Sequence, residues 1–339
     1  MELLGEKKLP EYWESYILQR LQRLKELDEL VGNNSDVLAF VSDVHWPDNA
    51  KYSPILLDVI KQNTKLEKLV CCGDMLTCHS KSDAISVLKE SISAYKTYFG
   101  NQFYYVNGNH DNNPYKGEAE MLSYEEQYQI CMKHLENSVF QQEQGRNGFH
   151  YYFDNKKSKI RYIVLDTKNM HPIYHKQYKW FAETALDLPD GWSVAVFMHW
   201  AYNLNKKTNQ NAMADDLIPI QIVTDILKSV KNKSYYQNNE FDIEVKYKNN
   251  IDVLFIASGH THTDGLVAWS GEIFPQEDSG IVSFTVSSDA FRYCGWTPHA
   301  KQVFKTIGEQ CFDIIHIDKL NRKVYLSRIG FGSDRFFSY

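Results

Sequence analysis

The sequence predicts an α/β protein in which two mixed β-sheets pack as a sandwich flanked by helices. Up to residue 136, short apolar runs alternate with longer amphipathic segments, the pattern of a mostly parallel sheet covered by helices. From residue 151 onward, shorter alternating runs indicate antiparallel strands. Hydrophobic residues make up 43% of the 339 residues, which supplies a large buried core and excludes wholesale disorder.

The N-terminal region is expected to form one amphipathic helix over residues 11–31. Leucine recurs there at every third position, with polar residues between, at Leu18, Leu21, Leu24, Leu27 and Leu30. The sequence Gly32-Asn33-Asn34 then ends the helix. We expect residues 1–33 to pack as a helix on a single domain formed by residues 34–339. Docking to a partner, or homo-oligomerisation, through this helix is the alternative left open.

The first half of the main domain is expected to alternate strand and helix. Apolar runs bounded by turn residues predict strands at 37–41, 66–72 and 103–106. Amphipathic stretches predict helices near 52–63, 82–98 and 118–136. This β-α-β-α order favours parallel strands with helical crossovers.

The second half changes pattern. A hairpin is predicted over 151–154 and 160–166, joined by Asn155-Lys156-Lys157, and a helix near 175–187 follows it. Buried strands are expected at 194–198 and 253–257, separated by a polar stretch. Antiparallel strands are expected at 266–269, 281–287, 312–317 and 323–328.

Charge and cysteine content narrow the function classes. The net charge of −6 lacks the basic footprint of a protein that holds a phosphate backbone, so we expect no nucleic-acid partner. No apolar run approaches the ~18–20 residues of a membrane span, and the N-terminus lacks the features of a secretory signal. The six cysteines form no C-x-x-C pair, so a reduced, cytoplasmic protein is expected. They are Cys71, Cys72, Cys78, Cys131, Cys294 and Cys311.

Ligand-type residues follow five of the predicted strands directly. The motifs are Ser42-Asp43-Val44-His45, Gly73-Asp74, Gly108-Asn109-His110-Asp111, Met198-His199-Trp200 and Gly259-His260-Thr261-His262. In open α/β sheets the carboxyl ends of the strands meet at one rim, where ligands bind. Five strand ends therefore deliver Asp, His and Asn side chains to one place.

This ordered set resembles the calcineurin-like metallophosphoesterases, whose pattern is D-x-H, G-D, G-N-H-D/E, H and G-H-x-H. The resemblance implies their four-layer fold and a dinuclear metal centre. It implies one metal held by Asp43, His45 and His262, a second held by Asn109, His199 and His260, and Asp74 bridging both. A shared carboxylate offsets the repulsion between two cations that clamp the attacking and leaving oxygens.

The resemblance also implies a cofactor and a mechanism. Imidazole and carboxylate ligands suit transition metals better than Ca²⁺ or Mg²⁺, so we expect two divalent ions, with Mn²⁺ first and Fe, Zn²⁺ or Co²⁺ as alternatives. A metal-bridging hydroxide would attack the phosphorus of a phosphoester substrate. His110, which follows a ligand directly, would protonate the leaving group or bind a phosphoryl oxygen. Asp111 would either orient His110 or cap the turn.

The finer resemblance is to the class III phosphodiesterase side of the superfamily. Met75-Leu76-Thr77 follows Asp74, where purple acid phosphatases have a Tyr ligand, and the Gly-Asp-x-His-Gly signature of protein Ser/Thr phosphatases is missing. Hydrolysis of phosphodiesters is therefore the leading prediction, with Asp74 and His110 as its catalytic residues. A phosphomonoesterase and a metal-stapled structural module of a phage-type assembly are the alternatives.

Part of the chain also resembles a phage, prophage and bacterial branch of these enzymes. The resemblance rests on the first helix, on residues 43–63 and on the C-terminal segment 328–339. It implies a surface-polymer or host-derived phosphoester substrate and a virion-associated location as the alternative to the cytoplasm.

Several further residues have two interpretations each. Trp46 and Trp200, which adjoin expected ligands, would either wall a substrate pocket or pack around the metals. Arg328 and Arg335 would bind phosphate or close a sheet edge. Within the long polar loop 201–215, Lys206 and Lys207 would meet a distal phosphate or remain solvated. His79, close to Asp74 in sequence, is a candidate additional ligand.

Overall fold

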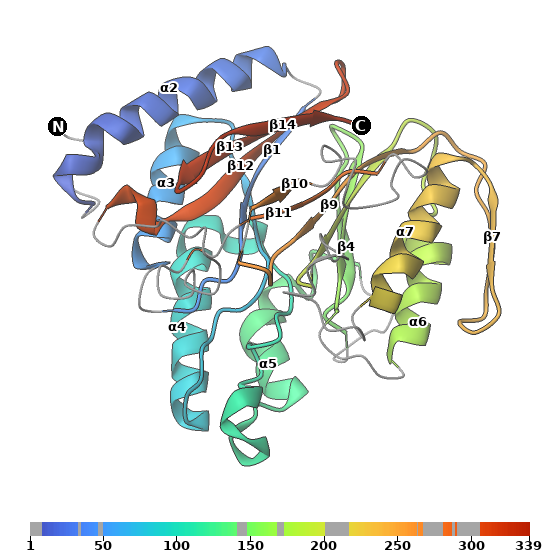
Figure 1. Ribbon diagram of the computed structural model, residues 1–339, viewed down its shortest axis with the longest axis horizontal. Helices are drawn as coiled ribbons and strands as arrows, with labels where there is room; N and C mark the ends of the chain where they lie inside the picture. The colour runs from blue at the N-terminus through green and yellow to red at the C-terminus, as the bar shows by residue number, and fades with distance from the viewer. Residues whose placement is uncertain are drawn as a thin grey trace.

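A computed structural model describes residues 9–32, 35–46, 50–140, 148–167, 173–200, 217–262, 264–266, 281–286, 289 and 306–339. Two six-stranded mixed sheets face each other in these residues, which confirms the predicted fold class (Figure 1). Sheet A contains, in spatial order, β14 (Arg335–Ser338), β13 (Lys323–Gly330), β12 (Cys311–Asp318), β1 (Asp36–Val41), β2 (Lys68–Cys71) and β3 (Phe103–Tyr105). Sheet B contains β10 (Gly265–Leu266), β11 (Ser283–Thr285), β9 (Asp252–Ser258), β6 (Ser193–Met198), β5 (Ile160–Leu165) and β4 (Tyr151–Asn155).

Helices cover the outer faces of the two sheets. In Figure 1, α2, α3 and α4 lie on the side of sheet A, and α6 and α7 stand beside sheet B. The helices are α2 (Glu14–Leu30), α3 (Ser53–Asn63), α4 (Lys81–Phe99), α5 (Tyr124–Cys131), α6 (Ile173–Trp180), the π-helical turn η7 (Phe181–Ala185) and α7 (Leu217–Lys231). None of the helices in the described part of the chain is both long and apolar enough to cross a bilayer.

The space between the sheets is filled by apolar side chains of both. Phe40 of β1 packs against Phe197 of β6, with ring centroids 5.7 Å apart. Successive residues of a strand face opposite sides of its sheet. In β6, Phe197 accordingly belongs to the cluster shared with sheet A, whereas Val196 belongs to the cluster under α7. Polar contacts also cross this interface. The Tyr162 hydroxyl donates to Asp36 at 2.7 Å, and the Tyr151 hydroxyl donates to the Tyr105 carbonyl at 2.9 Å.

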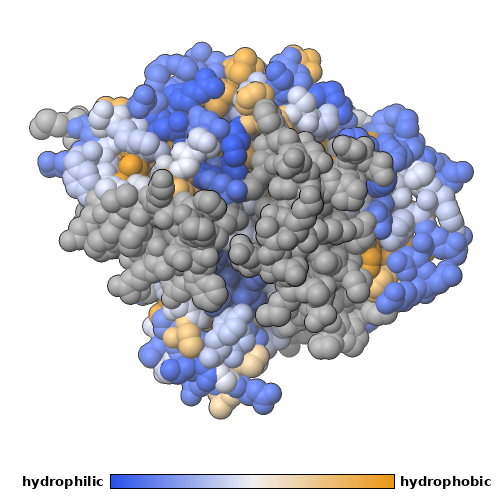
Figure 2. Space-filling model, viewed as in Figure 1, coloured by the Kyte–Doolittle hydropathy of each residue, from blue (hydrophilic) through white to orange (hydrophobic). Residues whose placement is uncertain are grey.

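The N-terminal helix α2 packs on sheet A, but it buries fewer of its leucines than the sequence pattern predicted. Leu21 and Leu24 are buried in the same core as β1, but Leu18 is 49% and Leu30 is 55% exposed. An α-helix has 3.6 residues per turn, so residues spaced three apart do not stay on one face. The first and last leucines of a long run with this spacing therefore lie outside the buried face. The described surface seen in Figure 2 is mostly hydrophilic, with scattered hydrophobic spots near its upper edge, where α2 lies.

Other elements differ from the prediction. The helix expected near 118–136 is broken, because Ser123 and Glu126 form a capping box that starts α5 in the middle of it. The polar stretch before β9 contains α7 and a two-stranded ribbon of β7 (Tyr235–Asn238) and β8 (Ile243–Lys246), which we did not predict. β11 was expected to be antiparallel; it is antiparallel to β10 but parallel to β9. The loop with Lys206 and Lys207, and Cys294, lie outside the described residues.

Candidate dinuclear metal centre

Five loops at the carboxyl ends of parallel strands hold the predicted site residues. β1, β2 and β3 run parallel in sheet A, and β6 and β9 run parallel in sheet B. Backbone hydrogen bonds join the loops within each sheet, from Asp43 to the Gly73 carbonyl and from Gly259 to the His199 carbonyl, both at 3.0 Å. The loops meet where the two sheets face each other, which brings residues more than 200 positions apart into contact.

Two groups of ligand-type side chains share one carboxylate. The first group is Asp43, His45, Asp74 and His262, and the second is Asp74, His199 and His260. Within each group, one ligand atom per residue lies within 4.8 Å of the others. His262 Nε2 lies 3.3 Å from both His45 Nε2 and an Asp43 oxygen. Asp74 Oδ2 lies 3.2 Å from His199 Nε2. Each group has the donor set of a divalent transition metal.

Asn109 completes the predicted set. Its amide oxygen lies 3.0 Å from His199 Nε2 and 2.8 Å from His260 Nδ1, so it faces the second group. The structure therefore brings together all seven residues that the resemblance implied as ligands. His79 is not in either group, and its ring instead contacts the Thr77 hydroxyl at 2.8 Å.

The backbone at these loops is strained. Five residues of the two groups have φ in the left-handed region: Asp43 at 54°, His45 at 44°, Asp74 at 54°, His260 at 68° and His262 at 52°. For residues other than glycine this conformation costs roughly 1–2 kcal/mol each. Such strain persists only where the surroundings enforce it, and it concentrates at functional sites. Here it turns the side chains sharply inward from the strand ends.

The glycines of the motifs allow the loops to touch. A Cβ on Gly259 would overlap the Ser42 hydroxyl and lie 2.6 Å from an Asp43 oxygen. A Cβ on Gly108 would overlap the backbone nitrogen and carboxylate of Asp74. The glycines before Asn109 and His260 are therefore required by close approach, which explains why they belong to the motifs.

We expect Gly259→Ala to lower kcat/KM by roughly 10²-fold, because the added methyl pushes the His260–His262 loop away from Asp43, and misplacement by about 1 Å costs that much. Steady-state kinetics with metal quantification tests this. Gly191→Ala is the control for a general loss of stability, since nothing lies within 4 Å of a Cβ at that position and only the positive φ of 78° opposes the alanine. Equal activity of the two variants would contradict the close-packing explanation.

Hydrogen bonds orient the imidazoles. His45 Nδ1 lies 2.7 Å from the Leu76 carbonyl and His199 Nδ1 lies 2.6 Å from the Cys72 carbonyl. A carbonyl only accepts, so each Nδ1 carries the proton and each Nε2 faces the centre, as metal-binding histidines require. Burial lowers the pKa of His45 and of His260 to about 4, which keeps both rings neutral at pH 7.

The carboxylates of the centre are ionised despite their burial. Burial raises the pKa of Asp43, but the adjacent His262 outweighs it and lowers the pKa to about 2. Burial likewise raises the pKa of Asp74, yet His199 and His110 bring it well below its ordinary value. Burial lowers the pKa of His199, but Asp74 more than compensates and raises it. A cation entering the second group would therefore displace a proton from His199.

His110 lies at the open side of the centre. Its side chain is 26% exposed, and its Nε2 lies 3.9 Å from Asp74 Oδ2. Its backbone N–H donates to the other oxygen of Asp74 at 2.8 Å. The ring packs edge-on against His45 and beside Tyr115. His110 is thus close to the shared carboxylate and accessible to a bound molecule.

Asp111 supports the backbone of the Asp74 loop. Its carboxylate accepts hydrogen bonds from the backbone N–H groups of Asp74 at 3.0 Å, Met75 at 2.6 Å and Gly108 at 3.0 Å, and from the Tyr105 hydroxyl at 2.6 Å. Of the two interpretations offered by the sequence, these contacts favour the turn-capping one. Asp111 is a positioning residue for the loop that carries the shared carboxylate.

The two tryptophans differ in environment. Trp46 is buried in the main core, so it packs around the centre. Trp200 is partly exposed, and its indole N–H donates to the Asn109 amide oxygen at 3.3 Å. Tyr115, which we did not single out from the sequence, is 61% exposed and accepts a hydrogen bond from the Asn109 amide at 3.0 Å. Trp200 and Tyr115 thus flank the second group.

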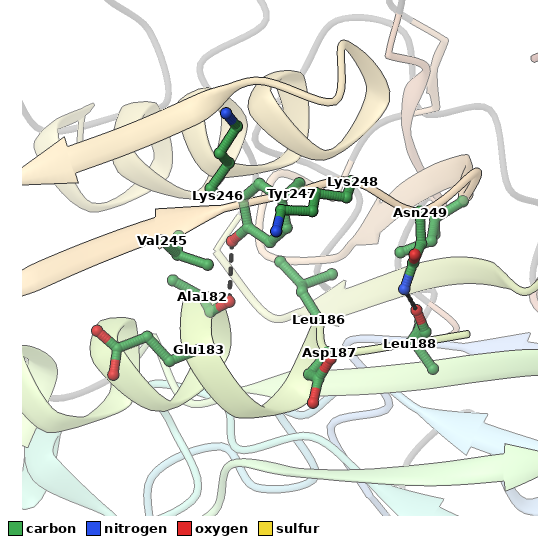
Figure 3. A pocket seen from close by; sticks show the side chains of 11 residues that line it. Ala182, Glu183, Leu186, Asp187, Leu188, Val245, Lys246, Tyr247, Lys248 and Asn249 are labelled. Atoms are coloured by element: carbon green, nitrogen blue, oxygen red, sulfur yellow. Dashed lines mark hydrogen bonds between the residues drawn. The ribbon is translucent and has the colours of Figure 1, made fainter. Parts of the chain in front are cut away.

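A pocket of about 240 Å³ lies elsewhere, between η7 and β8 (Figure 3). Its walls are tied by a hydrogen bond from the Tyr247 hydroxyl to the Ala182 carbonyl at 2.9 Å and by one from Asn249 to Leu188 at 2.7 Å. Its lining includes Glu183, Asp187, Lys246 and Lys248 but no residue of the two ligand groups. This pocket is therefore not the candidate active site.

A dimetal phosphatase of known structure shares the fold of this chain. A dimetal phosphatase from Danio rerio superposes with a TM-score of 0.52 at 14% identity, over 89% of this chain and 98% of that one. Vps29 from Cryptosporidium parvum gives 0.34 at 13% identity, over 90% and 99% of the two chains. A serine/threonine phosphatase from Saccharomyces cerevisiae with similarity to human phosphatase PP5 gives 0.34 at 11% identity, over 98% and 90%. Identities this low indicate fold and not function.

Sequence comparison identifies the family. No curated protein matches the chain. The family described as calcineurin-like phosphoesterase matches residues 37–264, which is more than half of the 339 residues and contains all five motif loops. The strand order, the two ligand groups and this match agree with one another. The chain belongs to the calcineurin-like phosphoesterase family.

Proposed function

We propose that this protein is a dinuclear metal-dependent phosphodiesterase. The observation that supports the proposal most is the position of Asp74, whose carboxylate belongs to both ligand groups at once. Asp43, His45 and His262 would hold one divalent ion, Asn109, His199 and His260 would hold the other, and Asp74 would serve both. Mn²⁺ is the proposed native ion.

Two ions bound there would supply Lewis acidity and a water of lowered pKa. The residues of the chain would bind the ions and supply a proton. The ionised Asp43 and Asp74 bring negative charge that favours cations, and the neutral His45 and His260 bring lone pairs. His110, accessible beside Asp74, gives a proton to the departing alkoxide.

Two features favour diesters over monoesters and over a purely structural role. The double-histidine ending His260-Thr261-His262 resembles the phosphodiesterase side of the superfamily, and His110 is retained beside a complete ligand set. A module that used metals only as staples would have no need of an accessible acid next to the bridging carboxylate. The substrate is proposed to be a small phosphodiester, since the net charge of −6 is unfavourable for a nucleic acid.

The proposal is tested by hydrolysis of bis-p-nitrophenyl phosphate and of p-nitrophenyl phosphate, with metal content measured on the same sample. We expect Mn²⁺-dependent turnover, a higher kcat/KM for the diester, and about two ions per chain. Preference for the monoester would replace the diesterase by a phosphomonoesterase. Two bound ions without turnover of either substrate, or of alkyl phosphodiesters, would favour the structural module.

A further inference from the structure

A buried arginine lies behind the His260–His262 loop. Arg328 of β13 is 2% exposed, and each of its five N–H groups donates a hydrogen bond. Two go to Asp264 at 2.6 and 2.8 Å, two go to Asp313 of β12 at 2.9 and 3.3 Å, and one goes to the Phe331 carbonyl at 2.7 Å. Because no donor is left over, Arg328 does not bind a phosphate, which excludes one of the two interpretations of the sequence.

The contact with Asp264 fixes one end of the ligand loop. Asp264 follows His262 by two residues, so its carboxylate and the His262 ring belong to the same short segment. The other end of the loop is held by Asp43, which accepts from the His260 backbone N–H at 3.0 Å, and by the His199 carbonyl, which accepts from Gly259 at 3.0 Å. Both histidines therefore lie between two anchored points.

Further contacts of the C-terminal strands hold Arg328 and its two carboxylate partners in place. Arg335 of β14 forms an ion pair with Asp313 on the side away from Arg328's Nε contact. Asp334 accepts from the Arg328 backbone N–H at 2.9 Å and pairs with Arg20 of α2. Gly332 lies against the pair, since a Cβ there would approach an Asp264 oxygen to 2.8 Å. Contacts thus run from α2 through the C-terminal strands to the ligand loop.

We propose that Arg328 and Asp264 form a positioning pair that holds His262, and with it His260, in the geometry that binds metal. The inference rests on the proposed metal sites. Arg328 is buried, whereas the Asp264 side chain is 28% exposed. The desolvation of Arg328 opposes its attraction to Asp264, so the pair contributes little net stability, and a role in placing the loop accounts for it better. The bidentate geometry requires arginine, since the single ammonium of a lysine cannot bridge two carboxylates in this way. Arg328 lies in the C-terminal strands, outside the family match at 37–264.

The test is metal binding to the apo-protein carrying Asp264→Asn. This isosteric change removes one charge. Asp313 then remains as the carboxylate that contacts both Arg328 and Arg335. We expect the affinity for Mn²⁺, measured by titration calorimetry, to fall by about 10–100-fold at the weaker site, the size of effect that outer partners of metal ligands have. Electron paramagnetic resonance should show isolated Mn²⁺ at concentrations where the wild type gives the exchange-coupled pair.

Asp252→Asn is the matched control. Asp252 lies at the opposite end of β9 and pairs with Arg322 at 2.6 Å, and its side chain is 35% exposed against 28% for Asp264. Its replacement therefore removes the charge of a similarly exposed aspartate far from the ligand loop. We expect it to bind Mn²⁺ as the wild type does. Thermal unfolding of each apo-protein reports whether the fold is retained.

Arg328→Lys provides a second, independent variant. If the two residues act as a pair, the double variant should bind Mn²⁺ no more weakly than the worse of the two single variants. Wild-type affinity and a coupled spectrum in folded Asp264→Asn would overturn the positioning role. Failure of the wild type itself to bind two ions would instead overturn the proposed function, so the two failures are distinguishable.

Discussion

Replacement of Asp74 by asparagine is expected to lower kcat by roughly 10³-fold or more. Asp74 is the one residue shared by both ligand groups, and it is almost completely buried. An amide of the same shape carries no charge, so it cannot offset the repulsion between two cations. The variant should also bind fewer than two ions per chain, measured by elemental analysis alongside the kinetics.

The control for this variant is Asp58→Asn in α3. Asp58 is another largely buried aspartate, and it accepts hydrogen bonds from Gln62 one turn along the helix at 3.0 and 3.1 Å, away from the ligand groups. It should retain nearly full activity. Turnover of Asp74→Asn within tenfold of the wild type, at full metal content, would falsify the shared-carboxylate assignment.

Replacement of His110 by glutamine is expected to lower kcat by about 10²–10⁴-fold on a diester with an alkyl leaving group. The effect should be much smaller on bis-p-nitrophenyl phosphate, because p-nitrophenolate leaves without needing a proton. Metal content should not change, since His110 is in neither ligand group. The dependence on the leaving group distinguishes proton donation from substrate binding. If His110 only bound the substrate, its replacement would lower the turnover of both substrates by the same factor.

His134→Gln serves as the comparison for His110. His134 contacts the Phe103 carbonyl at 2.9 Å at the far end of β3, so its loss should leave both substrates unaffected. An equal loss on the two leaving groups in His110→Gln would assign His110 to phosphate binding instead of acid catalysis.

The loops of the metal centre could be predicted because each motif is local and follows a strand. Asp43, Asp74 and His260 each come a few residues after an apolar run, and parallel strands bring such positions to one edge. The parallel pairing of β1, β2 and β3 agrees with the predicted alternation of strands and helices. The order β9-β6-β5 was not predicted, because α7 and the β7–β8 ribbon between β6 and β9 were not recognised in the polar stretch.

The supporting contacts could not be predicted, because they depend on tertiary neighbours with no local pattern. Arg328 meets Asp264 only after β13 and the loop beyond β9 are placed side by side, 64 residues apart in the chain. Asp111 looks in sequence like any turn carboxylate, yet it accepts from the backbone of another loop. The parallel pairing of β11 likewise depends on a connection whose length does not reveal its direction.

The strand order of sheet A also bears on how a newly made chain folds. All six residues of β1 are buried, and β1 lies between β2 and β12, which pairs with it through residues 313–317. A ribosome that has released only residues up to 264 has delivered every ligand loop, but the edge of β1 that pairs with β12 still exposes unpaired backbone N–H and C=O groups. Such edges pair readily with other chains. Sheet A is therefore complete only when the last strands have been made. A chain interrupted before β12 is a candidate for chaperone capture or aggregation.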